Sequence, residues 1–403
     1  MSNPSPALVR FQTQKSLAHR LTLATLTGRP VHISQIRPSS PTDPGLAPHE
    51  ISFLRLLEAV TNGSHIEISY TGTTLVYRPG LITGSSPGSG ASGGVIRHEL
   101  PAGCTRGVSY FLVPLCLLAP FSKAPINVLF TGSGVITSAT PTGDMSADSV
   151  RTAILPLYAQ FGISNNIELR ILRRSNVGAG GKGGAGEVHL VFGHQVRLPK
   201  TVHIMNPGRV KKIRGVAYCT GVSASNNARM IEEARGILNS MTGDTYIFSD
   251  VSSAAYLPSK DKSNPNQKRK TGVGFGLSLV AESSTGSLYS ADLASPPAGG
   301  VPPEDIGRQC AYQLLESVSL GGAVSLAAAT TVLTLMAMGS EDVGRLQLGR
   351  DVLGSETLIC LARDLKAFGA SGWGVRDANT GQEGDVVVSV VGRGVGNVGR
   401  KIA

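Results

Sequence analysis

The chain has 403 residues, of which 41% are apolar and 16% charged, so it is long and apolar enough for two or three packed domains and is not a largely disordered protein. Its formal net charge of +10 suits a polyanionic partner, because basic side chains displace counterions from phosphates, but it does not prove one. The five cysteines lie far apart and form no CxxC pair, which argues against a zinc site and fits a reducing compartment.

The first part of the chain alternates strands and helices. Its start, MSNPSPALVR, has no apolar core of the kind found in signal peptides. The stretch from Pro48 to Val60 predicts an amphipathic helix, because its apolar residues recur at helical spacing. In chain order we expect a strand and a helix within Phe11 to Gly28, a strand over Pro30 to Arg37, the helix over Pro48 to Val60, a hairpin over His65 to Tyr77, a flexible insertion over Thr83 to Gly94, a helix over Ser109 to Phe121, a strand over Asn127 to Thr131 and a helix over Ser146 to Phe161.

A glycine-rich stretch follows, between two predicted strands. Six of the twelve residues from Ser175 to Gly186 are glycine, Arg173 and Arg174 precede them, and Lys182 lies among them. Glycine reaches positive φ at little cost, so the amides of such a loop can turn inward together and form a concave nest for an anion. A loop that cradles phosphates is one interpretation, and a mobile hairpin tip is the other. It is not a Walker or Rossmann loop, because a strand follows it.

The last part of the chain also mixes both kinds of element. The run Pro258 to Gly272 is polar and basic, and we expect it to be disordered. It is either a solvated loop or a nucleolar-targeting or RNA-touching patch. The most apolar run, Ala323 to Met338, is short for a membrane span, so we expect a buried helix and no membrane partner. The other predicted elements are strands over Lys211 to Cys219, Tyr246 to Val251, Gly274 to Glu282, Ser287 to Ala291, Arg345 to Leu348 and Asp385 to Val391, and helices over Ala224 to Met241, Pro302 to Ser319 and Ser355 to Phe368.

With these elements in place, the chain resembles the RNA 3′-terminal phosphate cyclase family. The resemblance covers nearly the whole chain. It rests on an arginine pair, a glycine run and a Gly-Glu-Val sequence at Arg173 to Val188, on Ile36 to Leu57, on Arg106 to Phe121 and on Ala281 to Ser287. Ser52 to Gly80, Leu118 to Lys123 and Gly339 to Leu346 are similar to the cyclase-like branch of the family, whose members act in eukaryotic ribosome biogenesis.

This resemblance implies a mixed α/β fold. A large domain of three repeated α/β units is expected, interrupted by a small thioredoxin-like insert domain. The change in sequence texture places the insert at residues 196–297, so that residues 1–195 and 298–403 form the two parts of the large domain.

The resemblance also indicates where the reaction centre has been lost. Cyclases attack ATP with the histidine of an HxxT pattern, and the corresponding segment here is Gly354-Ser355-Glu356-Thr357. Glycine has no side chain to attack a nucleotide. Cyclases also carry a glutamate, three glycines and a glutamine near the N-terminus, where this chain has Phe11-Gln12-Thr13-Gln14-Lys15. We therefore expect no cyclase activity and no cofactor, although a nucleophile elsewhere in the chain would leave a surviving cyclase as a further hypothesis.

The resemblance implies a non-enzymatic factor of the nucleolar small-subunit processome. Such a factor supports the early pre-rRNA cleavages that yield small-subunit rRNA, and acts with a GTPase partner in the nucleus. Pre-rRNA and the small nucleolar RNA-containing pre-ribosomal particle are its other expected partners. No residue of this sequence identifies the GTPase docking surface.

Two sets of residues remain as candidate sites. For RNA or anion contact we predict Arg173, Arg174 and Lys182, with Arg37 and Arg106 as weaker candidates. The alternative function is an endonuclease that cleaves pre-rRNA. It would use Arg363, Asp364 and Lys366, which lie within one helical turn and have the types of side chain that act as base and phosphorane stabiliser. The other interpretation of these three residues is an ordinary charged helix face.

Overall fold

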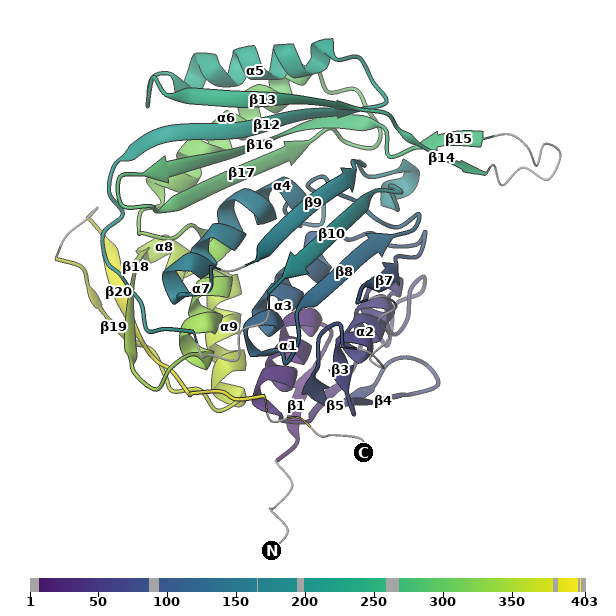
Figure 1. The fold of residues 1–403 in the computed structure, drawn as a ribbon, viewed down its shortest axis with the longest axis vertical. Coiled ribbons are helices and arrows are strands. Elements are labelled where there is room, and N and C mark those ends of the chain that lie inside the picture. Colours follow the sequence, from purple (N-terminus) through teal and green to yellow (C-terminus); the bar gives the residue numbers. More distant parts are fainter. Residues whose placement is uncertain are drawn as a thin grey trace, which may run out of the picture.

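The architecture is mixed α/β, in a large domain and a smaller insert domain (Figure 1). The computed structural model describes residues 7–86, 94–164, 166–193, 199–258, 268–379, 383–397 and 399. Most of the insertion predicted over Thr83 to Gly94, and the middle of the basic run Pro258 to Gly272, lie outside the described residues.

Among the described residues, three four-stranded sheets of the large domain share one connectivity. In each sheet the first strand is parallel to the second, the second is antiparallel to the fourth, and the fourth is antiparallel to the third. Each unit therefore runs β-α-β-α-β-β. This repetition is the threefold unit that the resemblance implied.

The elements of the three units are as follows. The first has β1 (Val9–Gln12), α1 (Leu17–Thr27), β2 (Val31–Ser34), α2 (Pro48–Val60), β4 (His65–Ile68) and β5 (Leu75–Arg78), with β3 (Thr61–Asn62) and β6 (Leu81–Ile82) as a small separate pair. The second has β7 (Ile96–Glu99), α3 (Ser109–Leu118), β8 (Ile126–Thr131), α4 (Ala147–Ser149) with π and 3-10 turns continuing to Phe161, β9 (Ile167–Arg173) and β10 (Glu187–Phe192). The third has β11 (His203–Ile204), α7 (Leu326–Met338), β18 (Val343–Gly349), α8 (Arg350–Leu353), α9 (Glu356–Ala367), β19 (Gly374–Asp377) and β20 (Asp385–Val391).

The three units share one hydrophobic core. Each sheet is apolar on the face toward the helices, and α1, α3, α7 and α9 lie together between the sheets (Figure 1). Leu21 of α1, Leu115 of α3 and Leu333 of α7 are fully buried there. Burying one face of every sheet against shared helices is what a half-apolar strand pattern requires. None of the helices described is both long and apolar enough to cross a bilayer.

The insert domain has its own core and its own sheet. Its elements are β12 (Val210–Thr220), α5 (Ser225–Leu238), β13 (Thr245–Ser252), β14 (Ala255–Pro258), β15 (Lys268–Thr271), β16 (Gly274–Ser283), β17 (Leu288–Ala294) and α6 (Pro303–Ser319). The sheet order is β13-β12-β16-β17, and the two long helices cover one of its faces. The topology β-α-β-β-β-α, apart from the short β14–β15 ribbon, fits the thioredoxin-like insert that the resemblance implied.

The predicted limits of the insert, 196 and 297, need correction at both ends. Strand β11 pairs with β18, so residues 203–204 belong to the large domain. Helix α6 contributes Ile306, Cys310 and Leu314 to the insert core, so the insert extends to about Ser319. An amphipathic helix shows in its sequence that one face is buried, but not which domain buries it.

A buried arginine joins the insert to the large domain. Arg174 follows β9, and its guanidinium donates to Asp148 of α4 through Nη1 at 2.5 Å and to Asp250 of β13 through Nε at 2.5 Å. Its Cζ also lies 5.0 Å from the ring centroid of Tyr218 on β12. The side chains of Arg174 and Asp148 are 6% and 1% exposed, so neither charge is solvated. The two charges therefore depend on each other.

Replacing this arginine tests the joint. We expect Arg174→Ala to lower the free energy of unfolding by about 3 kcal/mol, because buried Asp148 then keeps only the partly exposed Arg151 as a cation, at 3.0 Å, and Asp250 loses its partner. The neighbouring substitution Arg173→Ala is the matched control, since that side chain is half exposed. It should change stability by no more than about 0.5 kcal/mol. Denaturant unfolding of both variants checks this, and equal losses would contradict it.

Candidate functional site

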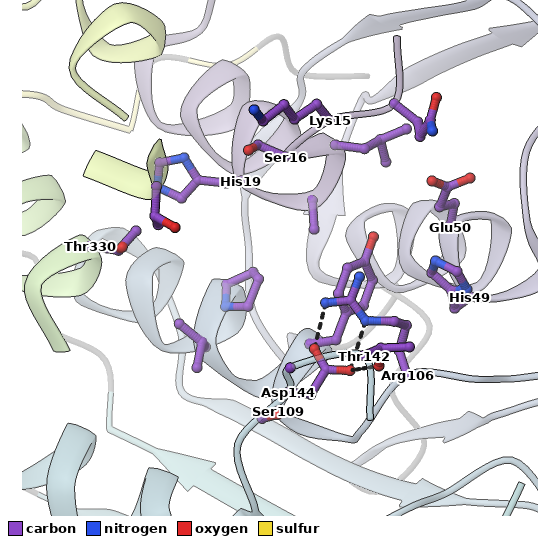
Figure 2. A pocket seen from close by; sticks show the side chains of 18 of the residues that line it. Lys15, Ser16, His19, His49, Glu50, Arg106, Ser109, Thr142, Asp144 and Thr330 are labelled. Atoms are coloured by element: carbon purple, nitrogen blue, oxygen red, sulfur yellow. Dashed lines mark hydrogen bonds and ion pairs between the residues drawn. The ribbon is translucent and has the colours of Figure 1, made fainter. Parts of the chain in front are cut away.

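The N-terminal ends of α1 and α2 meet α3, α7 and α9 around a pocket of about 670 Å³ (Figure 2). Gln14, Lys15 and Ser16 line it from the segment before α1, and Thr357 lines it from α9. Lys15 Nζ forms an ion pair with Glu356 Oε1. The structure thus brings together the two segments in which the sequence departs from the cyclase pattern.

The charged side chains that line the pocket balance one another. The cations are Lys15, Arg37 and Arg106, and the carboxylates are Glu50, Asp144 and Asp364. Arg37 is bidentate to Glu50, with Nη1 3.2 Å from Oε1, and Arg106 Nε donates to Asp144 Oδ2 at 2.7 Å. Figure 2 shows the Arg106–Asp144 pair at the pocket wall. A triphosphate requires unpaired cations, and these guanidinium groups are already neutralised.

Arg37 and Arg106 were predicted as weaker RNA contacts. Both are largely covered, with side chains 21% and 29% exposed, and both are held by carboxylates. Arg106 also stacks 4.5 Å above the ring of Tyr110. Their placement indicates that they shape the pocket wall, and it does not favour RNA contact.

Two histidines that the sequence pattern did not indicate as site residues line the pocket. His19 and His49 lie on opposite sides of the pocket in Figure 2. His19 Nε2 is 3.1 Å from Thr334 Oγ1, and His49 Nδ1 is buried without a hydrogen-bond partner in the described part of the chain. Burial lowers the pKa of each imidazole to about 4, so both are neutral at pH 7. They are the imidazoles that a surviving cyclase would have available.

Gly354 lies between α8 and α9 with ordinary right-handed helical angles, φ −72° and ψ −6°. A Cβ built on it would meet Arg350 O at 3.4 Å, an ordinary van der Waals contact. The backbone therefore does not demand glycine here. The residue is absent from the side chains that line the pocket, whereas Thr357 of the same segment is present.

The glycine-rich loop between β9 and β10 is packed into the structure. The amides of Gly183, Gly184 and Gly186 donate to the carbonyls of Cys104, Ser133 and Val135, at 2.9 Å in each case. A Cβ at Gly184 would lie 2.6 Å from Asn176 O, so the close approach requires glycine. The predicted anion nest is wrong for these amides, because they already have acceptors, and the loop is not a free hairpin tip.

The cations at this loop differ in accessibility. Lys182 is exposed, and the Arg173 side chain is half exposed with Glu187 at 3.6 Å. Arg174 is enclosed by the Asp148 and Asp250 carboxylates, so its predicted RNA contact is wrong in this structure. A guanidinium group whose N–H groups are paired with two carboxylates has no donor available to bind a phosphate.

The three nuclease candidates do not converge. Arg363 and Lys366 are exposed on α9, whereas Asp364 is 3% exposed and accepts from Arg20 Nε at 3.0 Å. Burial raises the pKa of Asp364, and the hydrogen bond from Arg20 opposes that shift. The carboxylate links α9 to α1, so the predicted nuclease cluster is wrong as a convergent site. The helical spacing of Asp364 from Leu361 and Phe368 already placed it on the buried face.

Comparisons with known proteins show which family the chain resembles over its length. The model of the family described as RNA 3′-terminal phosphate cyclase matches residues 9–368. The chain is 37% identical to the rRNA processing protein rcl1 of Schizosaccharomyces pombe, over 98% of both chains. It is 40% identical to the RNA 3′-terminal phosphate cyclase-like protein of Mus musculus, over 96% of both chains. It is 35% identical to the rRNA processing protein RCL1 of Saccharomyces cerevisiae, over the full length of both.

Substitutions on α9 test whether Asp364 is structural. We expect Asp364→Ala to lower the free energy of unfolding by about 3 kcal/mol, because it leaves Arg20 buried without its carboxylate. The double variant Arg363→Ala/Lys366→Ala should stay within about 0.5 kcal/mol of the parent, since both side chains are exposed. Denaturant unfolding measures both. A stable Asp364→Ala protein would return this carboxylate to the list of candidate catalytic groups.

Proposed function

This chain belongs to the RNA 3′-terminal phosphate cyclase family, and we propose that it is a non-enzymatic rRNA-processing factor of ribosome biogenesis. The observation that supports the loss of cyclase activity is the meeting of Lys15 and Glu356 at a pocket whose charges are balanced. Lys15 belongs to the N-terminal segment in which the resemblance implies glycines for an active cyclase. The lining offers no excess of cations to a nucleotide.

The proposed setting is the nucleolar small-subunit processome. There the chain supports the early pre-rRNA cleavages, together with a GTPase partner and the pre-ribosomal particle with its small nucleolar RNA. Full-length similarity to proteins named for rRNA processing supports this role. The proposed RNA contacts at the glycine-rich loop are Arg173 and Lys182, which are exposed, and no longer Arg174.

A labelling experiment tests the absence of cyclase chemistry. Purified protein incubated with labelled ATP should form no covalent adduct, because position 354 has no imidazole and the pocket cations are paired. The variant Gly354→His should fold, since a Cβ fits there, and should also remain unlabelled. Labelling of the parent protein, abolished by substitution of His19 or His49, would show that the nucleophile had been misplaced.

A second experiment tests the role in rRNA processing. A tagged chain isolated from its own cells should carry precursor rRNA of the small subunit, and its depletion should leave that precursor uncleaved. Northern analysis with probes across the early cleavage sites measures both. Normal precursor levels after depletion would contradict the proposal.

A further inference from the structure

A two-stranded ribbon projects from the insert domain, at the right of Figure 1. It consists of β14 and β15, which pair antiparallel with Tyr256 opposite Lys270, Leu257 opposite Arg269 and Pro258 opposite Lys268. The sequence predicts disorder over Pro258 to Gly272, but residues 268–271 form a strand through cross-strand pairing with β14. A polar segment can be a strand when its neighbour supplies the hydrogen bonds.

The ribbon carries one sign of charge. Lys268, Arg269 and Lys270 are consecutive and exposed, and no carboxylate pairs with any of them in the part of the chain that the structure describes. By contrast, carboxylates pair with the four arginines Arg20, Arg37, Arg106 and Arg174. Lys270 Nζ lies 6.0 Å from the ring centroid of Tyr256, which is 56% exposed. These cations are therefore free to bind a ligand.

The three cations occupy both faces of the ribbon. Successive side chains of a strand point to opposite faces, so Lys268 and Lys270 share a face and Arg269 lies on the other. A peptide lying along one face would leave the other cation unmatched. The phosphates of a folded RNA are distributed in three dimensions, so they can contact cations on both faces of the ribbon.

The base of the ribbon is fixed on the large domain. Gly272 O accepts from Asn176 N at 3.0 Å, and a Cβ at Gly272, which has φ +67°, would lie 2.3 Å from Gly184 O. The glycine-rich loop is therefore the seat of the ribbon. Lys182 is two residues from Gly184, and Lys270 is two residues from Gly272, so one cation of the loop and one of the ribbon are close in sequence to this contact.

We propose that the β14–β15 ribbon is an RNA-binding arm, in which Lys268, Arg269 and Lys270 contact phosphates of folded RNA from both faces of the ribbon. Lys182 adds a further cation at its base. The inference deepens the proposed function and rests on it for the identity of the polyanion as RNA. The ligand class itself follows from the charge and shape of the ribbon.

The test uses the full chain and a short RNA stem–loop. In the variant Lys268→Gln/Arg269→Gln/Lys270→Gln, the slope of log K against log salt should be smaller in magnitude by about 2–3 units, because up to three phosphate contacts are lost at ~0.9 each. Fluorescence anisotropy over a salt series measures this. The charge-conserving variant Lys268→Arg/Arg269→Lys/Lys270→Arg should keep the parent slope and so exclude a folding defect.

The matched control removes equal charge elsewhere, in Arg55→Gln/Lys123→Gln/Arg235→Gln, all exposed positions. It should leave the slope nearly unchanged. Equal slope losses in the control and the ribbon variant would overturn the proposal, as would a parent-like slope in the ribbon variant. Loss of binding to a poly-glutamate peptide, with stem–loop binding intact, would overturn it in favour of an acidic protein partner. If the ribbon variant binds the stem–loop normally and the parent protein still co-purifies pre-rRNA, the RNA-binding role of the ribbon is refuted and the proposed role in rRNA processing stands.

Discussion

The arrangement of the two domains depends on one buried cation held between two carboxylates. Arg174 follows the strand before the glycine-rich loop, Asp148 lies on a helix of the second unit, and Asp250 lies on the edge strand of the insert. Burial makes an unpaired charge costly, so the buried Arg174 and Asp148 favour the position of the insert in which Asp250 also contacts Arg174. The hydroxyl groups of Ser149 and Ser278 lie 3.0 Å apart and form a further hydrogen bond across the same junction.

The seat and the glycine-rich loop form one structural unit. The amides of the loop donate hydrogen bonds to neighbouring carbonyls. The loop backbone also packs closely against Gly272 at the base of the ribbon. Glycine is needed there because backbone meets backbone, with no room for a Cβ. A feature that resembles a phosphate-binding loop in sequence therefore acts in this chain as a joint, and the accessible cations lie beside it.

The cations of the pocket wall and those of the ribbon differ in whether a carboxylate pairs with them. At the pocket, Arg37 and Arg106 are neutralised by Glu50 and Asp144, which supports the proposed absence of cyclase activity. On the ribbon the cations have no such partners in the described part of the chain. The net charge of +10 is thus informative only after the paired charges are set aside.

The sequence alone determined most local structure. Helix α2 spans Pro48–Val60 as its apolar spacing predicts, and Ser355 caps α9 by accepting from Leu358 N. The glycine at position 354 was also plain in the sequence. Tertiary structure alone decided which charges are used: Arg20 meets Asp364 across 344 residues, and Arg174 meets Asp250 across 76. Helical and strand periodicity report the burial of neighbours along the chain, whereas an ion pair depends on a separation in space that periodicity does not encode.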